Sequence, residues 1–198
     1  MELATLKATL RSDRGKGAAR RMRREQAIPA IAYGKDLKPV ALAVSPKALK
    51  EVLTSEYGLN SVIKLEIEGG ESFHTLVAEY QYHPVSRNLL HVDFRRVDLQ
   101  KPVDVNIPFE VKGRSKGVVL GGELRMVYRS LPVSCLPEQI PTKIVHDVTE
   151  LDLEESVLVK DLNVPEGVSV RMAENRTVVT VAAGRAAKTA EEEEAEKA

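Results

Sequence analysis

The segment 89–97 alternates apolar with polar residues. Its polar members are His91, Asp93 and Arg95. Alternation with period two is typical of a half-buried β-strand, because successive side chains of a strand point to opposite faces. The apolar members, which should face the core, are Leu90, Val92 and Phe94. The polar row, with its members roughly 7 Å apart, is then exposed or turned toward a ligand.

An imidazole near a carboxylate is compatible with three kinds of chemistry. His91 and Asp93 with a distal His146 could form a two-histidine, one-carboxylate iron site, although the H-x-D match is short and frequent by chance. The same pair with a serine such as Ser86 could belong to a hydrolase, but the G-x-S-x-G nucleophile elbow is absent. In the third interpretation, His91 and Asp93 bond base edges or riboses while Arg95 lies near phosphate. An exposed polar strand face without a ligand is the alternative to all three.

Four arginines fall within five positions, with no acidic residue among them. They are Arg20, Arg21, Arg23 and Arg24. On a helix, Arg20, Arg23 and Arg24 share a face and Arg21 lies to one side. Guanidinium forks suit phosphate oxygens and guanine edges better than lysines do. A solvated basic face is the alternative, but the lack of a balancing acid favours nucleic-acid binding.

The glycine-rich stretch 14–17 precedes this arginine cluster. It is not a phosphate-binding P-loop, because G-x-x-x-x-G-K-[ST] is absent. Gly15 and Gly17 still permit close approach of the backbone to a phosphate near Lys16, and the N-terminus of the following helix favours an anion. An ordinary flexible loop is an equal alternative. Tyr33 either stacks or hydrogen-bonds at an RNA surface, or lies at the edge of the core.

A net charge of zero over 198 residues conceals an asymmetry. Residues 1–50 carry twelve Lys/Arg against four Asp/Glu, whereas residues 99–198 carry thirteen against seventeen. Nucleic acid is the commonest partner of such a localised basic region. The single Cys135 excludes a disulfide framework and a multi-cysteine zinc site, which fits a reducing cytosol. The absence of Trp and of long apolar runs argues against a large aromatic ligand cavity, a signal peptide and a membrane helix.

Short elements should position these residues. Expected strands of the first half are 3–10, 28–34, 40–44, 62–68, 73–82 and 89–97. Helices are expected over 18–26, from its helix-forming composition, and over 46–55, where Ser45 is an N-cap and proline follows at the first helical position. The segments 62–68 and 73–82 should form a hairpin across Gly69-Gly70.

A domain boundary is expected near residues 99–102, because the pattern beyond it is almost wholly β. Expected strands there are 103–111, 124–129, 132–136, 142–148, 168–171 and 177–182, with a helical turn over 156–162. The sequence therefore predicts a mainly β protein with short helices. It has a first domain over 1–98, a β-rich, sandwich-like domain over 99–183, and an acidic, disordered tail over 184–198.

Several spaced motifs occur together in one order. They are residues 15–23 with 28–34, 81–84 with 90–94, 121–124, 135–141, and 161–162 with 164–168. This arrangement resembles the bacterial ribosomal protein L twenty-five family, in its long form of the Ctc or general-stress-protein type. The resemblance extends to about Ala183. The loop after His83-Pro84 departs from it, since Val85-Ser86-Arg87 is poorer in lysine.

The resemblance implies a non-catalytic component of the large ribosomal subunit, in the cytoplasm, that needs no cofactor. A small N-terminal β-barrel would bind the loop E region of 5S rRNA, and the C-terminal domain would reach neighbouring large-subunit proteins and rRNA. No membrane and no small-molecule substrate is expected. The implied RNA-binding residues are Arg11, Lys16, Arg20, Arg21, Arg23, Tyr33, His91 and Asp93. An iron oxygenase and a β-sandwich protein-interaction module are the competing functions.

Overall fold

The structure, a computed structural model, describes residues 4–35 and 37–183. The chain divides into two compact units. One unit comprises residues 1–103 with 136–140, and the other comprises 104–135 with the chain from 141 onward. The acidic tail predicted for 184–198 lies outside the described residues.

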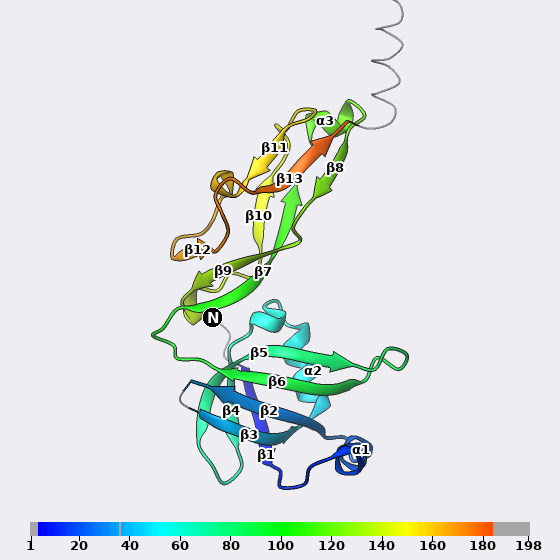
Figure 1. Ribbon diagram of the computed structural model, residues 1–198, viewed down its shortest axis with the longest axis vertical. Coiled ribbons are helices and arrows are strands. Elements are labelled where there is room, and N and C mark those ends of the chain that lie inside the picture. Colours follow the sequence, from blue (N-terminus) through cyan, green and yellow to red (C-terminus); the bar gives the residue numbers. More distant parts are fainter. Residues whose placement is uncertain (1–3, 36, 184–198) are drawn as a thin grey trace, which may run out of the picture. The chain divides into compact units, whose positions relative to one another are not determined.

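The first unit is a closed barrel of six strands in the order β1-β3-β2-β6-β5-β4 (Figure 1). The strands are β1 (Ala4–Leu10), β2 (Ile28–Gly34), β3 (Leu37–Val44), β4 (Ile63–Ile67), β5 (Ser72–Tyr82) and β6 (Leu89–Arg96). Two of the pairings, β1 with β4 and β2 with β6, are parallel, and the others are antiparallel. Closure leaves no open sheet edge for unwanted pairing.

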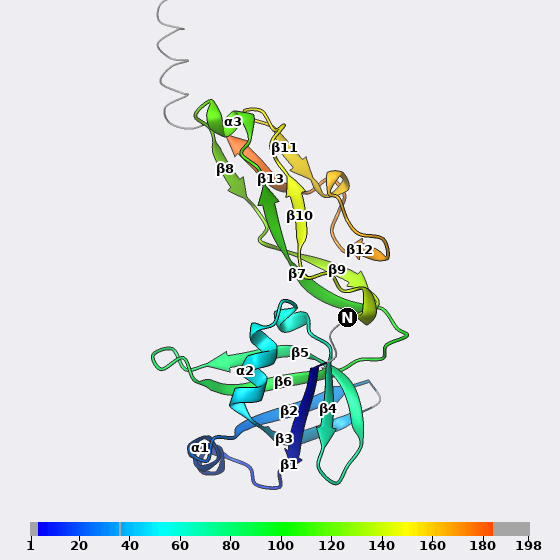
Figure 2. The ribbon, with the colours of Figure 1, turned by 180° about the vertical axis from the view of Figure 1, so that it is seen from behind.

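Two helices and one helical turn accompany the barrel, which Figures 1 and 2 show from opposite sides. Helix α1 (Lys16–Arg24) follows Gly15, whose φ of 95° is a conformation that glycine adopts readily. Helix α2 (Pro46–Thr54) starts after Ser45 as predicted, although the Ser45 side chain makes no capping hydrogen bond. A 3-10 turn, η1 (Gly58–Asn60), comes before β4.

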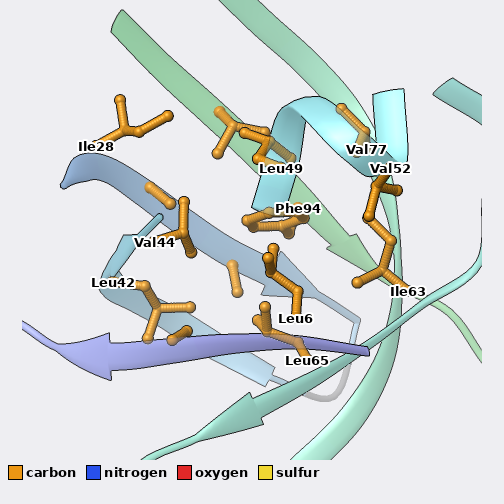
Figure 3. Close-up of a cluster of buried hydrophobic side chains, with 14 of the residues drawn as sticks. Leu6, Ile28, Leu42, Val44, Leu49, Val52, Ile63, Leu65, Val77 and Phe94 are labelled. Atoms are coloured by element: carbon orange, nitrogen blue, oxygen red, sulfur yellow. The ribbon is translucent and has the colours of Figure 1, made fainter. Parts of the chain in front are cut away.

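The core of the barrel consists of the inward-facing residues of the strands, covered by Leu49 and Val52 of α2 (Figure 3). Phe94 on β6 is fully buried and pairs with Ala32 on the parallel strand β2. A small residue opposite a large one is needed because the interior of so small a barrel is filled by side chains alone. The small side chain of Ala32 in β2 is therefore explained by packing inside the barrel.

One residue of β6 lies differently from the prediction. Leu89 is buried, whereas Leu90 is only half-buried. The cause is a bulge, because β5 pairs Gln81 with His91 but Tyr82 with Leu89. A bulge inserts one unpaired residue and locally turns the strand. Leu90, predicted to lie on the buried face with Phe94, is therefore less buried than expected, and Leu89 joins the core instead.

The second unit is also β-rich, and it contains two sheets. One has the order β10-β7-β9-β12, from Ile144–Asp147, Val103–Lys112, Ser130–Cys135 and Val168–Val170. The other has the order β11-β13-β8, from Ser156–Leu158, Thr177–Ala182 and Glu123–Met126. Its short helical segments are α3 (Lys116–Val119) and η3 (Val159–Asp161), whereas the 3-10 turn η2 (Pro137–Gln139) falls in the part of the chain assigned to the first unit.

Alternation along β7 buries Ile107 and Phe109, while Pro108 between them is exposed. The helical turn predicted for 156–162 is half right, since strand β11 occupies its first part and η3 follows. The mainly β fold, with an N-terminal barrel and a β-rich C-terminal unit, is confirmed. Within the described residues, no helix is long and apolar enough to span a membrane.

Candidate nucleic-acid interface

Polar residues of β2 and β6 lie on the outer face of the barrel. Val92 and Phe94 point into the core, so His91, Asp93 and Arg95 point outward, as the alternation predicts. The parallel register places Tyr33 of β2 directly beside Arg95. Tyr33 is half-buried, and its inward neighbour Ala32 is fully buried. The three residues predicted to recognise bases or shape, Tyr33, His91 and Asp93, therefore share one face.

His91 and Asp93 contact each other on this face. The imidazole Nδ1 lies 2.7 Å from the Asp93 carboxylate Oδ1. Their side chains are 29% and 28% exposed, so both remain accessible from outside. The bond fixes the orientation of the imidazole and leaves its Nε2 and the second carboxylate oxygen as the atoms that can face a ligand. The sequence shows that the two residues share a face, but not that they bond to each other.

Helix α1 supplies the positive charge of the candidate site. The basic side chains of this helix are Lys16, Arg20, Arg21, Arg23 and Arg24, and all are exposed. Three of them lie in the last turn, where cations interact favourably with the helix dipole. No acidic residue lies in the first turn of α1. The helix therefore presents a continuous cationic surface, as the arginine cluster predicts.

A side-chain contact joins α1 to the strand that carries the His91–Asp93 pair. The Arg23 Nε and Nη2 both donate to the backbone carbonyl of Leu90, at 3.1 and 3.0 Å. Leu90 immediately precedes His91, so the helix is held next to the outward-facing row of β6. Figure 1 shows α1 near the end of the barrel where β2 and β6 begin. The cationic helix and the polar row therefore form one joined face.

Arg11 extends the same face across the barrel. Its backbone N–H donates to the Ala41 carbonyl at 3.1 Å, which continues the pairing of β1 with β3. Ala41 pairs with Ile31, and Ile31 pairs with Asp93. The half-buried Arg11 side chain has its Nε buried without a hydrogen-bond partner in the described structure.

Two further polar residues on this face were missed by the sequence interpretation. Glu79 lies opposite Asp93, and Gln81 lies opposite His91, in the antiparallel pairing of β5 with β6. Both side chains are exposed. Strand alternation indicated which side they face. Their neighbours, however, depend on a register that passes through a bulge, and the sequence alone does not reveal that register.

His83 and Cys135 have structural surroundings. The His83 Nδ1 accepts hydrogen bonds from the backbone N–H groups of Val85 and Ser86, which shapes the β5–β6 loop. Burial raises the pKa of the Cys135 thiol. Within residues 4–35 and 37–183, no group of three or more His, Cys, Asp and Glu side chains could hold a metal ion. The iron-site interpretation thus has no ligand set in that part of the chain.

Comparison with known proteins links both units to ribosomal proteins. Residues 6–94 match the Ribosomal L25p family, and residues 102–185 match the family described as "Ribosomal protein TL5, C-terminal domain". The first match covers the barrel strands up to Phe94, and the second covers the β-rich unit. These matches confirm the resemblance to the long form of the family.

Curated relatives are similar over nearly the whole chain. The "Large ribosomal subunit protein bL25" of Sorangium cellulosum is 50% identical over 198 residues, which is 100% of this chain and 86% of the relative. Proteins of the same name from Syntrophotalea carbinolica and Geobacter sulfurreducens are 40% and 39% identical. They cover 97% and 91% of this chain and 92% and 94% of their own length. The relatives are ribosomal proteins and not enzymes, as the resemblance implied. The chain therefore belongs to the bL25 family of large ribosomal subunit proteins, in the form that carries a TL5-type C-terminal domain.

Proposed function

We propose that this structural protein of the large ribosomal subunit binds 5S rRNA, at its loop E region, through the outer face of the barrel. One observation carries the proposal. The Arg23–Leu90 contact joins the cationic helix α1 to the strand that presents His91 and Asp93. Phosphate attraction and hydrogen-bonding groups for base edges thus occur on one continuous surface, which is the combination that specific RNA binding requires.

The predicted site residues divide into two roles. Arg11, Lys16, Arg20, Arg21 and Arg23 make up the cationic part, which faces phosphate oxygens. Tyr33, His91 and Asp93 make up the recognition part. An Asp93 oxygen accepts a hydrogen bond from a base amino group, and Tyr33 stacks or hydrogen-bonds beside it.

The RNA partner must expose base edges to this face. The major groove of a regular A-form helix is too narrow for side chains to read. An irregular helix with an opened groove, as in loop E, provides base edges and a distinctive backbone shape together. The rigid outer surface of a closed barrel suits such a target, because little conformational order is lost on binding.

The C-terminal residues 99–183 have a separate role in the proposal. They extend the contacts of the protein toward neighbouring large-subunit proteins and rRNA, while residues 1–98 form the 5S rRNA-binding domain. The second unit is rich in charged side chains that pair with one another, such as Lys143 with Glu110 at 2.8 Å and Arg125 with Glu123 at 2.9 Å. Paired charges attract phosphate less than the unbalanced arginines of α1 do, which favours the barrel as the main RNA-binding part.

A gel-shift titration of the full chain with 5S rRNA, with tRNA as the competitor, tests the proposal at near-physiological salt. We expect 5S rRNA to bind at least tenfold more tightly than tRNA. With about six phosphate contacts, the affinity should fall roughly a thousandfold between 50 and 200 mM salt. Equal affinity for the two RNAs would leave only general electrostatic attraction and would refute specific 5S rRNA binding.

A further inference from the structure

Helix α1 is weakly attached to the barrel by its apolar side chains. It has nine residues, and none of them is buried. Ala18, Ala19 and Met22 are half-buried and provide its apolar contact. A helix this short is marginal in water when isolated, and most helices in proteins are held by a buried apolar face. Something other than burial must therefore fix the position of this helix.

The contact of Arg23 with Leu90 supplies that attachment. Two guanidinium N–H groups, from Nε and Nη2, converge on a single carbonyl oxygen at 3.1 and 3.0 Å. The two residues are 67 positions apart in the chain. Hydrogen bonds from a charged donor are stronger than those between neutral groups, and the rigid guanidinium fork fixes the direction as well as the distance.

The Leu90 carbonyl is available because of the bulge in β6. In the registers of the described strands, β5 pairs with His91 and with Leu89, and β2 begins its pairing at Val92. Leu90 therefore has no opposite residue in either neighbouring strand. A backbone carbonyl left out of a sheet needs a partner of another kind, and Arg23 provides it.

We infer that Arg23 is a positioning residue, which fixes the cationic helix α1 against the strand carrying His91 and Asp93. This inference rests on the proposed binding of 5S rRNA, and it changes the role of one residue in the cationic set. The Nε and Nη2 edge of an arginine is an edge that makes bidentate contacts with phosphate. In Arg23 that edge donates to the Leu90 carbonyl. Arg23 therefore contributes to RNA binding by positioning the other cations of α1.

The first experiment uses the free full-length protein and compares Arg23→Lys with Arg114→Lys. Both variants keep the charge, but only the first removes a guanidinium that bonds β6. Arg114 is an exposed arginine of the second unit, outside α1 and outside the candidate interface. We expect the amides of α1 to exchange hydrogen at least tenfold faster in Arg23→Lys than in the parent chain, with an unchanged midpoint of global unfolding. Arg114→Lys should leave both quantities unchanged.

The second experiment measures RNA binding by the same variants. Because total charge is conserved, a misplaced helix should weaken 5S rRNA binding by Arg23→Lys about tenfold, while tRNA binding and the salt slope stay as in the parent chain. A role confined to stabilising the fold would not change the ratio of 5S rRNA to tRNA affinity, since the same folded fraction binds both. Arg114→Lys should keep the parent ratio.

The outcomes separate the inference from the function on which it rests. Unchanged amide exchange in Arg23→Lys would overturn the positioning role. Faster exchange with unchanged 5S rRNA affinity would overturn it as well, because the helix position would then be irrelevant to binding. If the parent chain itself does not prefer 5S rRNA over tRNA, the proposed function fails. The exchange measurement on free protein still shows whether Arg23 holds α1.

Discussion

Replacement of Asp93 by asparagine is the most informative single change at the barrel face. The substitution keeps the shape of the side chain but removes its negative charge and replaces one oxygen by an NH₂ donor. In the parent chain, one carboxylate oxygen accepts from His91 at 2.7 Å, and the other can accept from a base amino group. Asparagine has only one acceptor oxygen, so in Asp93→Asn the side chain cannot accept from His91 and from the base amino group at the same time, and its NH₂ group faces one of the two donors. We therefore expect specific RNA binding to weaken.

The magnitudes distinguish a binding effect from a folding effect. The Asp93 and His91 side chains are 28% and 29% exposed, and ion pairs near the surface contribute about 0–1 kcal/mol to stability. Loss of a good base-edge contact costs about 1–3 kcal/mol of binding free energy. That range corresponds to an affinity loss of about 5- to 150-fold. The loss in affinity should therefore exceed any change in the free energy of unfolding.

The appropriate assay is a filter-binding or gel-shift titration with 5S rRNA and with tRNA, beside urea denaturation of the same variant. Asp152→Asn is the matched control. It removes the same charge from an exposed aspartate of the second unit, outside the predicted RNA-binding set. The control should bind 5S rRNA as the parent chain does, or slightly more tightly.

The sign of the effect makes the test stringent. Removal of any negative charge near RNA reduces repulsion from phosphate, so general electrostatics predicts equal or tighter binding by Asp93→Asn. Weaker binding to 5S rRNA with unchanged binding to tRNA can therefore be attributed to lost recognition. If Asp93→Asn binds 5S rRNA as tightly as the parent chain, Asp93 does not read a base and the recognition role assigned here is wrong.

Three further measurements test the core, the cationic helix and a carboxylate at the end of strand β10. Phe94→Ala should lower the free energy of unfolding by about 3–5 kcal/mol in urea denaturation, because Phe94 is fully buried in the barrel. A much smaller loss would mean that the barrel interior is not close-packed. Joint replacement of Arg20 and Arg21 by alanine should reduce the slope of log affinity against log salt by about 2, and an unaltered slope would exclude both as phosphate contacts. Hydrogen bonds from the Thr149 hydroxyl and backbone N–H lower the pKa of Asp147 below its ordinary 3.8, so this carboxylate stabilises the fold above that pH and the contribution is lost as the pH falls through the folded-state pKa. Asp147→Asn should flatten the acid side of the stability profile, and an identical profile would contradict this.

The strands of the barrel could be located from the sequence, but their pairing could not. Alternation along 28–34 and 89–97 indicates two half-buried strands, and both are present as β2 and β6. The parallel pairing of β2 with β6 joins segments about sixty residues apart, and periodicity carries no information about such partners. Only the resemblance to a known family predicted that the strands close into a barrel.

Helix boundaries show how local signals succeed and fail. Ser45 and Pro46 mark the start of α2 correctly, because proline is suited to the first helical position. The prediction placed the start of the basic helix at Ala18, whereas α1 begins at Lys16. Gly17 lowers helix propensity, but Gly15, with its positive φ, is the residue that separates the helix from the preceding chain.

The candidate site was predictable by residue type and not by contact. The sequence identifies His91 and Asp93 as a polar pair, and the spacing of two places them on one face. The bond between Arg23 and the Leu90 carbonyl could not be predicted, because it depends on a bulge that frees a backbone acceptor. Side-chain contacts with backbone groups far along the chain are set by tertiary structure, so they have no signature in local patterns.

An acidic residue on the face proposed to bind RNA has a physical purpose under that proposal. Phosphate attraction by the arginines of α1 is independent of sequence and would favour any RNA duplex. Asp93 opposes such binding, because a phosphate brought near its carboxylate is repelled, whereas a base amino group is attracted. The His91 Nδ1 lies 2.7 Å from the Asp93 Oδ1, and this contact favours the side-chain orientation that keeps the carboxylate on this face. Under the proposed function, specificity arises from a difference between targets. The helix attracts all of them, whereas the His91–Asp93 pair favours RNA that presents base edges at that point.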